Sequence, residues 1–241
     1  MVPTFRSLSV AKIDLTAPPV RHPDVVGRLV SLNADHHRRM AADAALREAV
    51  AAQGGPREQA RIAAGDHASR DALLEAMRGA VGRFGFDRTG DRTVLEIGAG
   101  HGGDAGALRA WLHAEYVGIE VVPDVAAASG VLNLALEECP EDWNGKFDWI
   151  YSRHVMEHVP DVDLALSTVK RLLAPGGVVG AVTPHYFPDP EPAHVTQLRL
   201  GAWMEAYRRH GLTPVYAVEA TYVCAEAHLV LAHADDVHGK F

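Results

Sequence analysis

The most constraining feature of this 241-residue chain is a glycine-rich segment that follows a short apolar run. The run Val94 to Ile97 has the composition of a buried strand, and a helical pattern begins at Ala105. The six residues 98–103 between them include four glycines: Gly98, Gly100, Gly102 and Gly103. Glycine lets the backbone turn sharply and lets a ligand lie against it without a Cβ clash. In open α/β sheets such a strand–turn–helix unit binds its ligand beyond the carboxyl end of the strand, so the segment predicts a ligand site.

Two acidic residues near this loop indicate what kind of ligand it holds. Gly98, Gly100 and Gly103 fit the dinucleotide pattern G-x-G-x-x-G, which alone is a weak indicator. Glu120 follows Gly98 by 22 residues, where an acid contacts the ribose of several nucleoside cofactors. Glu96 discriminates better, because pyrophosphate prefers uncompensated helix N-terminal N–H groups. A carboxylate beside the loop therefore favours a cationic ligand.

From residue 91 onward, strand-like apolar runs alternate with helical patterns. Strands are predicted over 93–97, 116–120, 147–152, 178–183, 213–218 and 228–233. Helices are predicted over 105–113, 162–173 and 203–210, the last closed by Gly211. This alternation favours a parallel sheet with helices on both faces, so the predicted fold class is α/β, doubly wound.

Residues 1–90 have a different pattern, with several helical signals and weak strand signals. An Ala-rich helix is predicted over 35–53 and ends at Gly54-Gly55-Pro56. A second helix is predicted over 69–84, where apolar residues recur on one face. We therefore expect an N-terminal helical cap, residues 1–90, in front of a ligand-binding domain, residues 91–241. The cap is expected to cover the site.

The composition disfavours several classes of function. The formal net charge is −8, from 23 Lys+Arg against 31 Asp+Glu, and an acidic surface disfavours bulk nucleic-acid binding. Cys139 and Cys224 lack metal-ligand spacing, and two cysteines are too few for an iron–sulfur cluster held by this chain alone. We see no signal-peptide pattern and no apolar run of about 18 residues, so we expect a cytoplasmic protein without a membrane span.

Four segments, in this order, resemble the motifs of class I S-adenosylmethionine-dependent methyltransferases of the small-molecule (type 11-like) branch. They are the acid-x-Gly-x-Gly-x-Gly loop 96–102, the second strand 116–120 with its acid, the fourth-strand segments 147–152 and 155–161, and the turn 172–178 into strand five. Together they cover about residues 91–235. Four matches in the family's order are specific, where one would be weak.

This resemblance implies a fold and a cofactor. It implies a seven-stranded Rossmann-like sheet with an antiparallel last strand, and S-adenosyl-L-methionine across the ends of strands one, two and four. The residues that it assigns to the cofactor are Glu96, Gly98, Ala99, Gly100, Gly102, Glu120, Val121, Ser152 and Arg153. The family's third strand has no clear counterpart between Val121 and Lys146. Within that stretch, Glu137 or Glu138 is expected to contact the adenine.

The resemblance also implies methyl transfer, a displacement for which the protein supplies alignment and desolvation. A base is needed only when the acceptor keeps its proton, as a hydroxyl does. The candidate catalytic residues are His154, His158 and His185. The candidate acceptor-binding residues are Tyr186, Phe187 and His194. His158 and His194 fit structural roles as well.

We therefore expect methyl transfer to an O or N atom of a small organic molecule, by a monomer or homodimer, with no metal ligand assigned. Four alternatives stay open. His154 to His158 spells H-x-x-E-H, a zinc peptidase motif when both histidines lie on one helix. A metal-assisted methyltransferase would use His154, His158 and His185 as ligands. A nicotinamide-dependent oxidoreductase, against which Glu96 argues, and a cofactor-binding protein without catalysis are the other two.

Overall fold

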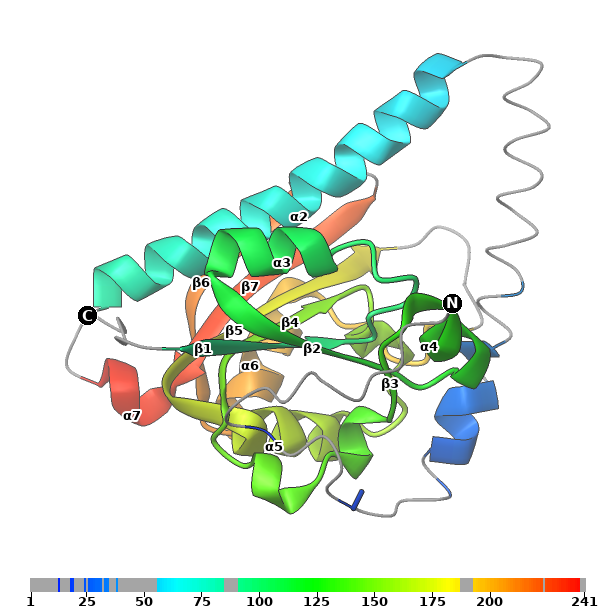
Figure 1. Ribbon diagram of the computed structural model, residues 1–241. Helices are drawn as coiled ribbons and strands as arrows, with labels where there is room; N and C mark the ends of the chain where they lie inside the picture. Colours follow the sequence, from blue (N-terminus) through cyan, green and yellow to red (C-terminus); the bar gives the residue numbers. More distant parts are fainter. Residues whose placement is uncertain are drawn as a thin grey trace.

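One seven-stranded sheet forms the centre of the computed structural model (Figure 1), with the strand order β3-β2-β1-β4-β5-β7-β6. The structure describes residues 13, 18–19, 24, 26–31, 33–34, 38, 56–84, 91–186, 193–222 and 224–238, with the backbone alone at 56–64, 66 and 185–186. The strands are β1 Arg92–Ile97, β2 Ala114–Glu120, β3 Leu132–Asn133, β4 Phe147–Arg153, β5 Leu173–Tyr186, β6 Leu212–Thr221 and β7 Ala225–His233.

Strand direction divides the sheet into a parallel and an antiparallel part. β3, β2, β1, β4 and β5 pair in parallel, whereas β7 runs antiparallel to both β5 and β6. The carboxyl ends of β1, β2 and β4 therefore meet at one edge, where a ligand of an open α/β sheet is expected. The predicted fold, a doubly wound sheet with an antiparallel last strand, is confirmed.

Helices cover both faces of the sheet (Figure 1). They are α2 Pro56–Phe84, α3 Ala105–Leu112, α4 Pro123–Ser129, α5 Val162–Leu172, α6 Leu200–Arg209 and α7 Ala234–Val237, with 3-10 turns η1 Leu136–Glu138, η2 Glu141–Trp143 and η3 Met156–His158. Among the helices that the structure describes, none has a stretch long and apolar enough to cross a membrane.

Two clusters of buried apolar side chains hold these layers together. On one face, Leu73 and Met77 of α2 and Leu108 of α3 belong to a cluster with Val94 of β1 and Tyr151 of β4. On the other face, residues of α5 and α6 form a cluster with the alternate residues of the same strands, such as Leu95 and Ile150. Successive side chains of a strand point to opposite faces, so both faces of β1 and β4 are apolar because both are covered.

Most of the predicted elements are present, with shifted bounds. The helix predicted over 69–84 is the second half of α2, which begins at Pro56, a favourable first helical residue. The third strand, without a clear pattern in the sequence, is the two-residue β3, paired with Ile119 and Glu120 of β2. α4 was not predicted. The helix predicted over 35–53 lies outside the described residues, apart from the helical backbone of Arg38.

The boundary at residue 90 between a helical cap and a ligand-binding domain stays a prediction. α2 falls in the predicted cap, yet it packs directly on β5 and β7 and shares their buried cluster. A separate helical stretch near the N-terminus, blue in Figure 1, has helical backbone at residues 26–31 and 33–34. Its Leu29 is 5% exposed, so this stretch also packs against the rest of the chain.

The contact between α2 and β5 is close enough to require a glycine. A Cβ atom on Gly180 of β5 would lie 2.3 Å from Sδ of Met77, which is itself fully buried. We therefore expect Gly180→Val to lower the free energy of unfolding by about 1–3 kcal/mol, the usual cost of overpacking. Chemical denaturation measures this change.

The double variant Met77→Ala/Gly180→Val should recover part of the loss, because the smaller side chain frees the space. Gly79→Ala serves as a matched control on α2, where a Cβ meets no atom within 4 Å among the described residues. This control should be neutral or slightly more stable. A Gly180→Val protein as stable as the wild type would contradict the packing of α2 on the sheet.

Candidate functional site

The glycine loop after β1 is held in a conformation that favours glycine at three positions. Gly98, Gly100 and Gly102 have φ angles of 65°, 50° and 74°, in the left-handed region where side chains are strained. A Cβ on Gly98 would lie 2.4 Å from a methyl group of Val155, whereas one on Gly100 would meet no atom within 4 Å in the described part of the chain. The loop therefore packs tightly at Gly98 and leaves open space at Gly100.

Glu120, the last residue of β2, fixes this loop through its side chain. Its Oε2 accepts a hydrogen bond from the Gly100 N–H at 3.0 Å, and its Oε1 accepts one from the Val122 N–H at 2.9 Å. The Ala99 N–H donates to the Ile119 carbonyl at 2.9 Å. These bonds join the ends of β1 and β2, and each carboxylate oxygen keeps a lone pair for a further donor.

A cavity opens where these strands end. It contains about 680 Å³ of empty space, part of it open to solvent. Its walls come from the glycine loop, the end of β2, the segment after β3, the turn after β4 and the N-terminal helical stretch. The lining residues are Leu29, Asn33, Ile97, Gly98, Gly100, Ile119, Glu120, Val121, Leu134, Ala135, Leu136, Glu137, His154, Val155, His158 and Val159.

Glu137 is the acid that the cavity presents beyond β3. The short strand is tied to β2, because the Leu134 N–H and the Asn133 side-chain amide both donate to the Glu120 carbonyl, at 3.1 and 3.0 Å. The next turn, η1, places the Glu137 side chain in the lining at 2% exposure. Burial raises the pKa of Glu137 to about 7. Its Oε1 has no hydrogen-bond partner among the described residues, so a donor is missing there.

Glu96, predicted to contact the cofactor, points to the face of the sheet that α2 and α3 cover. It shares the face of Val94 that packs on α2 and α3, and the Tyr116 hydroxyl donates a hydrogen bond to its Oε2. Burial raises the pKa of Glu96 to about 7, although the Tyr116 hydrogen bond lowers it. Glu96 is absent from the described residues that line the cavity, and its role in cofactor binding stays a prediction.

Ser152 and Arg153 end β4 with side chains on opposite faces. The Arg153 Nε donates to Oδ2 of Asp104 at 2.9 Å, and the Tyr151 hydroxyl donates to the same oxygen at 2.8 Å. Arg153 therefore belongs to a polar group near α3 and not to the described cavity lining. Ser152 is buried, and its Oγ has no hydrogen-bond partner within the described part of the chain.

His154 lines the cavity and is held by two buried carboxylates. Its Nδ1 lies 3.6 Å from Oε1 of Glu157, and its Nε2 lies 3.4 Å from Oε1 of Glu226. Its φ angle of 56° is unusual for a residue with a side chain. Burial alone would lower the pKa of His154, but Glu157 and Glu226 outweigh burial and raise the pKa to about 9. Both ring nitrogens then carry protons that face carboxylates.

Glu226, on β7, has hydrogen-bonding partners on α2, in the turn after β4 and on its own strand. Ser69 of α2 donates to its Oε2 at 2.6 Å, and His228 Nε2 lies 2.9 Å from the same oxygen. Burial would raise the pKa of Glu226, but hydrogen bonds from His154, His228 and Ser69 hold it well below its usual range. This group connects α2 and β7 to the cavity wall at His154, and sequence reasoning did not identify it.

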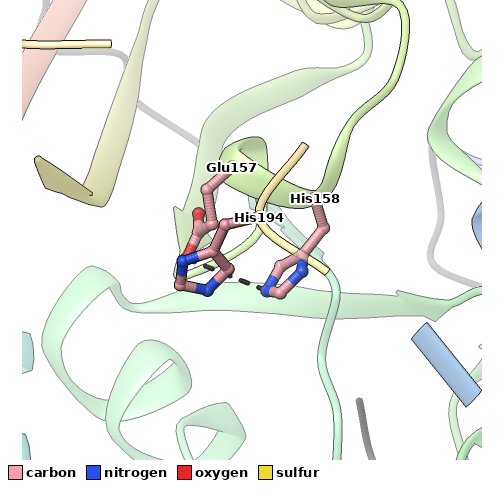
Figure 2. A group of neighbouring side chains, drawn as sticks. All are labelled: Glu157, His158 and His194. Carbon is pink, nitrogen blue, oxygen red and sulfur yellow. Dashed lines mark ion pairs between the residues drawn. The ribbon is translucent and has the colours of Figure 1, made fainter. Parts of the chain in front are cut away.

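His158 lines the cavity, and His194 packs against it. His158 Nδ1 lies 3.0 Å from the Ala193 carbonyl oxygen, which can only accept, so Nδ1 carries the proton. The rings of His158 and His194 meet edge to face with centroids 4.8 Å apart. Glu157 lies beside these two rings (Figure 2). One carboxylate oxygen of Glu157 and one ring nitrogen of each histidine, all potential metal ligands, lie within 4.8 Å of one another.

The structure therefore brings together one part of the predicted site. The predicted residues that line the cavity are Gly98, Gly100, Glu120, Val121, Glu137, His154 and His158. His194 contacts one of them, His158. Ala99 and Gly102 shape the loop, because the Gly102 N–H donates to the Ala99 carbonyl at 2.8 Å. The side chains of His185 and Tyr186, and all of Phe187, lie outside the described residues.

Sequence reasoning missed the lining residues that come from distant segments. Leu29 and Asn33 are one helical turn apart, and the Asn33 side-chain amide donates to the Leu29 carbonyl at 3.0 Å. They line a cavity built by strands of which the first, β1, begins only at Arg92. Only the expectation that the N-terminal helices cover the site pointed to such residues.

The H-x-x-E-H motif does not form the helix that a zinc peptidase site requires. Residues 156–158 form the single 3-10 turn η3, and His154 precedes it in a left-handed conformation. His154 faces Glu226, whereas His158 faces the Ala193 carbonyl. The two histidines therefore do not share a helix face, and the peptidase interpretation is wrong on this point.

Comparison with known proteins agrees on one class of enzyme. A family model described as "Methyltransferase domain" (Methyltransf_23) matches residues 58–229. Phosphoethanolamine N-methyltransferase 2 of Caenorhabditis elegans is 29% identical over 116 residues, 41% of this chain and 25% of that protein. Tocopherol O-methyltransferase, chloroplastic, of Arabidopsis thaliana is 33% identical over 106 residues, 38% of this chain and 30% of that protein. The matches thus span less than a third of the length of these relatives.

A solved structure supports the fold. Geranyl diphosphate C-methyltransferase from Streptomyces coelicolor A3(2), in complex with Mg²⁺, geranyl diphosphate and S-adenosyl-L-homocysteine, superposes with a TM-score of 0.54 at 14% sequence identity. The superposition covers 68% of this chain and 77% of that chain. At this identity the likeness concerns the fold alone.

The buried Glu96 predicts a dependence of stability on pH. Its folded-state pKa of about 7 exceeds the usual 4.5, so its contribution to stability is fully present below about pH 4.5 and is lost as the pH rises through 7. We expect the free energy of unfolding of the wild type to fall by about 3 kcal/mol relative to Glu96→Gln between pH 5 and pH 8. Denaturant titrations at several pH values measure this difference.

The exposed Glu141 provides the control for this measurement. Glu141→Gln should follow the wild-type pH profile, because that carboxylate meets water in both states. If the Glu96→Gln and wild-type curves ran parallel from pH 5 to pH 8, Glu96 would not be buried as described.

Proposed function

The chain belongs to the methyltransferase-domain family, whose model matches residues 58–229, and we propose that it transfers a methyl group from S-adenosylmethionine to an O or N atom of a small organic molecule. The predicted class of enzyme and its cofactor are confirmed by this membership. The nicotinamide-dependent alternative is wrong for the same reason. The acceptor and its reacting atom are the proposal.

The residues at the cavity fit S-adenosylmethionine. Gly100 leaves open space against which a ligand can lie, and its positive φ angle keeps side chains away. Glu120 has spare lone pairs for the two hydroxyls of a ribose. Glu137 offers a buried oxygen that lacks a donor among the described residues, as an adenine amino group would supply. This match between cavity and cofactor is the observation that carries the proposal.

The bound cofactor supplies a methyl group on a cationic sulfur, which an acceptor displaces directly. The chain's own contribution is alignment and exclusion of water. Apolar side chains such as Leu134, Leu136, Val155 and Val159 form much of the wall, and two acids, Glu120 and Glu137, lie in the same lining. Such a lining favours a cation with an apolar surround.

His154 is better suited to positioning than to proton removal. Both of its ring nitrogens face carboxylates, Glu157 and Glu226, so neither presents a lone pair to an acceptor. Among the three predicted catalytic histidines, this leaves two candidates for a base: His185 and His158, whose Nδ1 proton faces the Ala193 carbonyl. An acceptor that loses its proton in water, such as an amine with a low pKa, needs neither.

The choice of an O or N acceptor is supported by the curated relatives. One is named for N-methylation and the other for O-methylation, and both matches exceed 28% identity. The C-methyltransferase resembles this chain in fold alone. The expected homodimer or monomer, and the expected cytoplasmic location, stay predictions.

The N-terminal helical stretch is placed to select the acceptor. Leu29 and Asn33 line the cavity from a segment outside the residues of the family match. A part of the cavity wall that lies outside the family's shared domain can differ between related enzymes while the cofactor site stays the same. We therefore propose that this stretch sets acceptor choice.

Gly100→Val tests the cofactor site. The valine would be strained at a φ of 50° and would occupy the open space next to Glu120. We expect affinity for S-adenosylmethionine to fall about 100-fold or more, equivalent to about 3 kcal/mol, measured by equilibrium dialysis with labelled cofactor. Gly106→Ala on α3, where a Cβ also has space, is the matched control and should bind normally. Equal affinities of the two variants would place the cofactor elsewhere.

Acceptor selection is tested with a panel of hydroxyl- and amine-bearing small molecules and methyl-labelled S-adenosylmethionine. For the best acceptor found, Leu29→Ala and Asn33→Ala should raise the KM about fivefold or more, a typical loss for a truncated pocket contact. Affinity for the cofactor should change far less. The exposed Ser31→Ala on the same stretch is the control. Unchanged KM values in both cavity variants would refute the role of this stretch.

A further inference from the structure

Glu157 is a buried carboxylate with few donors around it. It is 1% exposed, and neither of its oxygens accepts a hydrogen bond from any described residue. Its nearest partners are histidine nitrogens at 3.6 Å, on His154, and 3.9 Å, on His158. A carboxylate removed from water normally carries hydrogen bonds or coordinates a metal. The nearer of the two histidines, His154, also faces Glu226. Glu157 therefore lacks the set of partners that a buried carboxylate normally has.

Two histidine nitrogens, potential metal ligands, lie next to the Glu157 carboxylate. Figure 2 shows the side chains of Glu157 and His158, from η3, converging with His194 from the neighbouring segment. One oxygen of Glu157 and one ring nitrogen from each histidine all lie within 4.8 Å of one another. Ligands of a single ion, each about 2.1 Å from it, lie roughly 3.4 Å apart. Side-chain movements of about 1 Å would therefore bring the three ligand atoms within bonding distance of one ion.

The tautomer of His158 is already correct for a ligand. Its Nδ1 donates to the Ala193 carbonyl at 3.0 Å, which leaves the Nε2 lone pair directed away from that bond. Metal-binding histidines usually donate their second ring N–H to a carbonyl or carboxylate in this way. The same carbonyl precedes His194 in the chain, so one peptide unit positions two of the three donors.

The backbone fixes the segment that carries His194 to the turn that carries the other two residues. The Thr196 N–H donates to the Glu157 carbonyl at 2.9 Å, and the Thr196 hydroxyl donates to the Val159 carbonyl at 2.8 Å. Thr196 thus joins the segment of His194 to η3 and to Val159, which follows η3. A site built from two segments held in this way loses little entropy when it closes on an ion.

We propose that Glu157, His158 and His194 bind a divalent transition-metal ion, with zinc as the best match to two imidazole nitrogens and one carboxylate. Three protein ligands leave one coordination position open, as in sites that also bind water or substrate. His158 belongs to both the donor set and the cavity lining, so the ion lies at the cavity wall. This donor set differs from the His154, His158 and His185 set that the sequence suggested.

The proposal changes the role of His158. With its Nε2 bound to an ion, His158 is a ligand and not a base. The competing account is that His158 and His194 pack edge to face without an ion, as their 4.8 Å contact allows. The two accounts differ in what the protein binds, and no measurement of methyl transfer is needed to separate them.

The test uses full-length protein without an affinity tag, stripped with a chelator and titrated with Zn²⁺ in a calorimeter. We expect one-to-one binding at micromolar protein. Titration with Co²⁺ should give the intense visible absorption of a four-coordinate nitrogen–oxygen site. Zn²⁺ should also raise the temperature of thermal unfolding, because an ion that binds the folded state stabilises it.

His194→Ala should weaken Zn²⁺ binding about 100-fold or more, since even loss of an outer-shell partner costs about 10–100-fold. Glu157→Gln is the second variant, with the same shape and no charge, and should lose the cobalt spectrum. The exposed His67→Ala on α2 is the control for adventitious binding by surface histidines. Circular dichroism confirms that each variant is folded.

The proposal is overturned if the stripped wild type binds no zinc, or if His194→Ala and His67→Ala bind it equally. Either result would leave His158 and His194 as a packing pair. Affinity for S-adenosylhomocysteine, measured on the same samples, reports separately on the proposed function, so failure of one proposal does not imply failure of the other.

Discussion

The carboxylate of Glu120 is the interaction on which the site depends. It joins the ends of two parallel strands by accepting the N–H groups of Gly100 and Val122, at 3.0 and 2.9 Å. One bond sets the shape of the glycine loop, and the other sets the start of α4. The carbonyl of the same residue accepts two more bonds from Asn133 and Leu134. The glycine loop, the start of α4 and the segment after β3 are therefore all hydrogen-bonded to one residue at the end of β2.

A second buried group determines the other side of the cavity. His154 lies between Glu157 and Glu226, and Glu226 is itself held by Ser69 and His228. Removal of one partner from such a network leaves a buried charge without compensation, which is costly. α2 contributes Ser69, which donates a hydrogen bond to Glu226, to this network. The long helix is thus part of the site's architecture as well as of the core.

The sequence predicted what local pattern determines, and missed what distant contacts determine. Apolar runs identified β1, β2 and β4, whereas the two residues of β3 are too few to show a period. Glu120 and Gly100, which the loop motif predicts to contact the cofactor, line the cavity. Arg153 is not among the described residues that line it, because strand alternation places its side chain on the face opposite Ser152, where it donates to Asp104. Glu226 and Leu29 reach the site across long sequence separations, which no single-sequence pattern reveals.

We propose that this cavity binds S-adenosylmethionine, the nucleoside cofactor of the methyl transfer. Calorimetric titration of the purified wild-type protein with S-adenosylhomocysteine, with NAD in a parallel titration, tests it most directly. We expect one-to-one micromolar binding of S-adenosylhomocysteine and no heat of binding from NAD. Binding of NAD alone, or of neither compound, would contradict the assignment of the glycine loop, Glu120 and Glu137 to this cofactor.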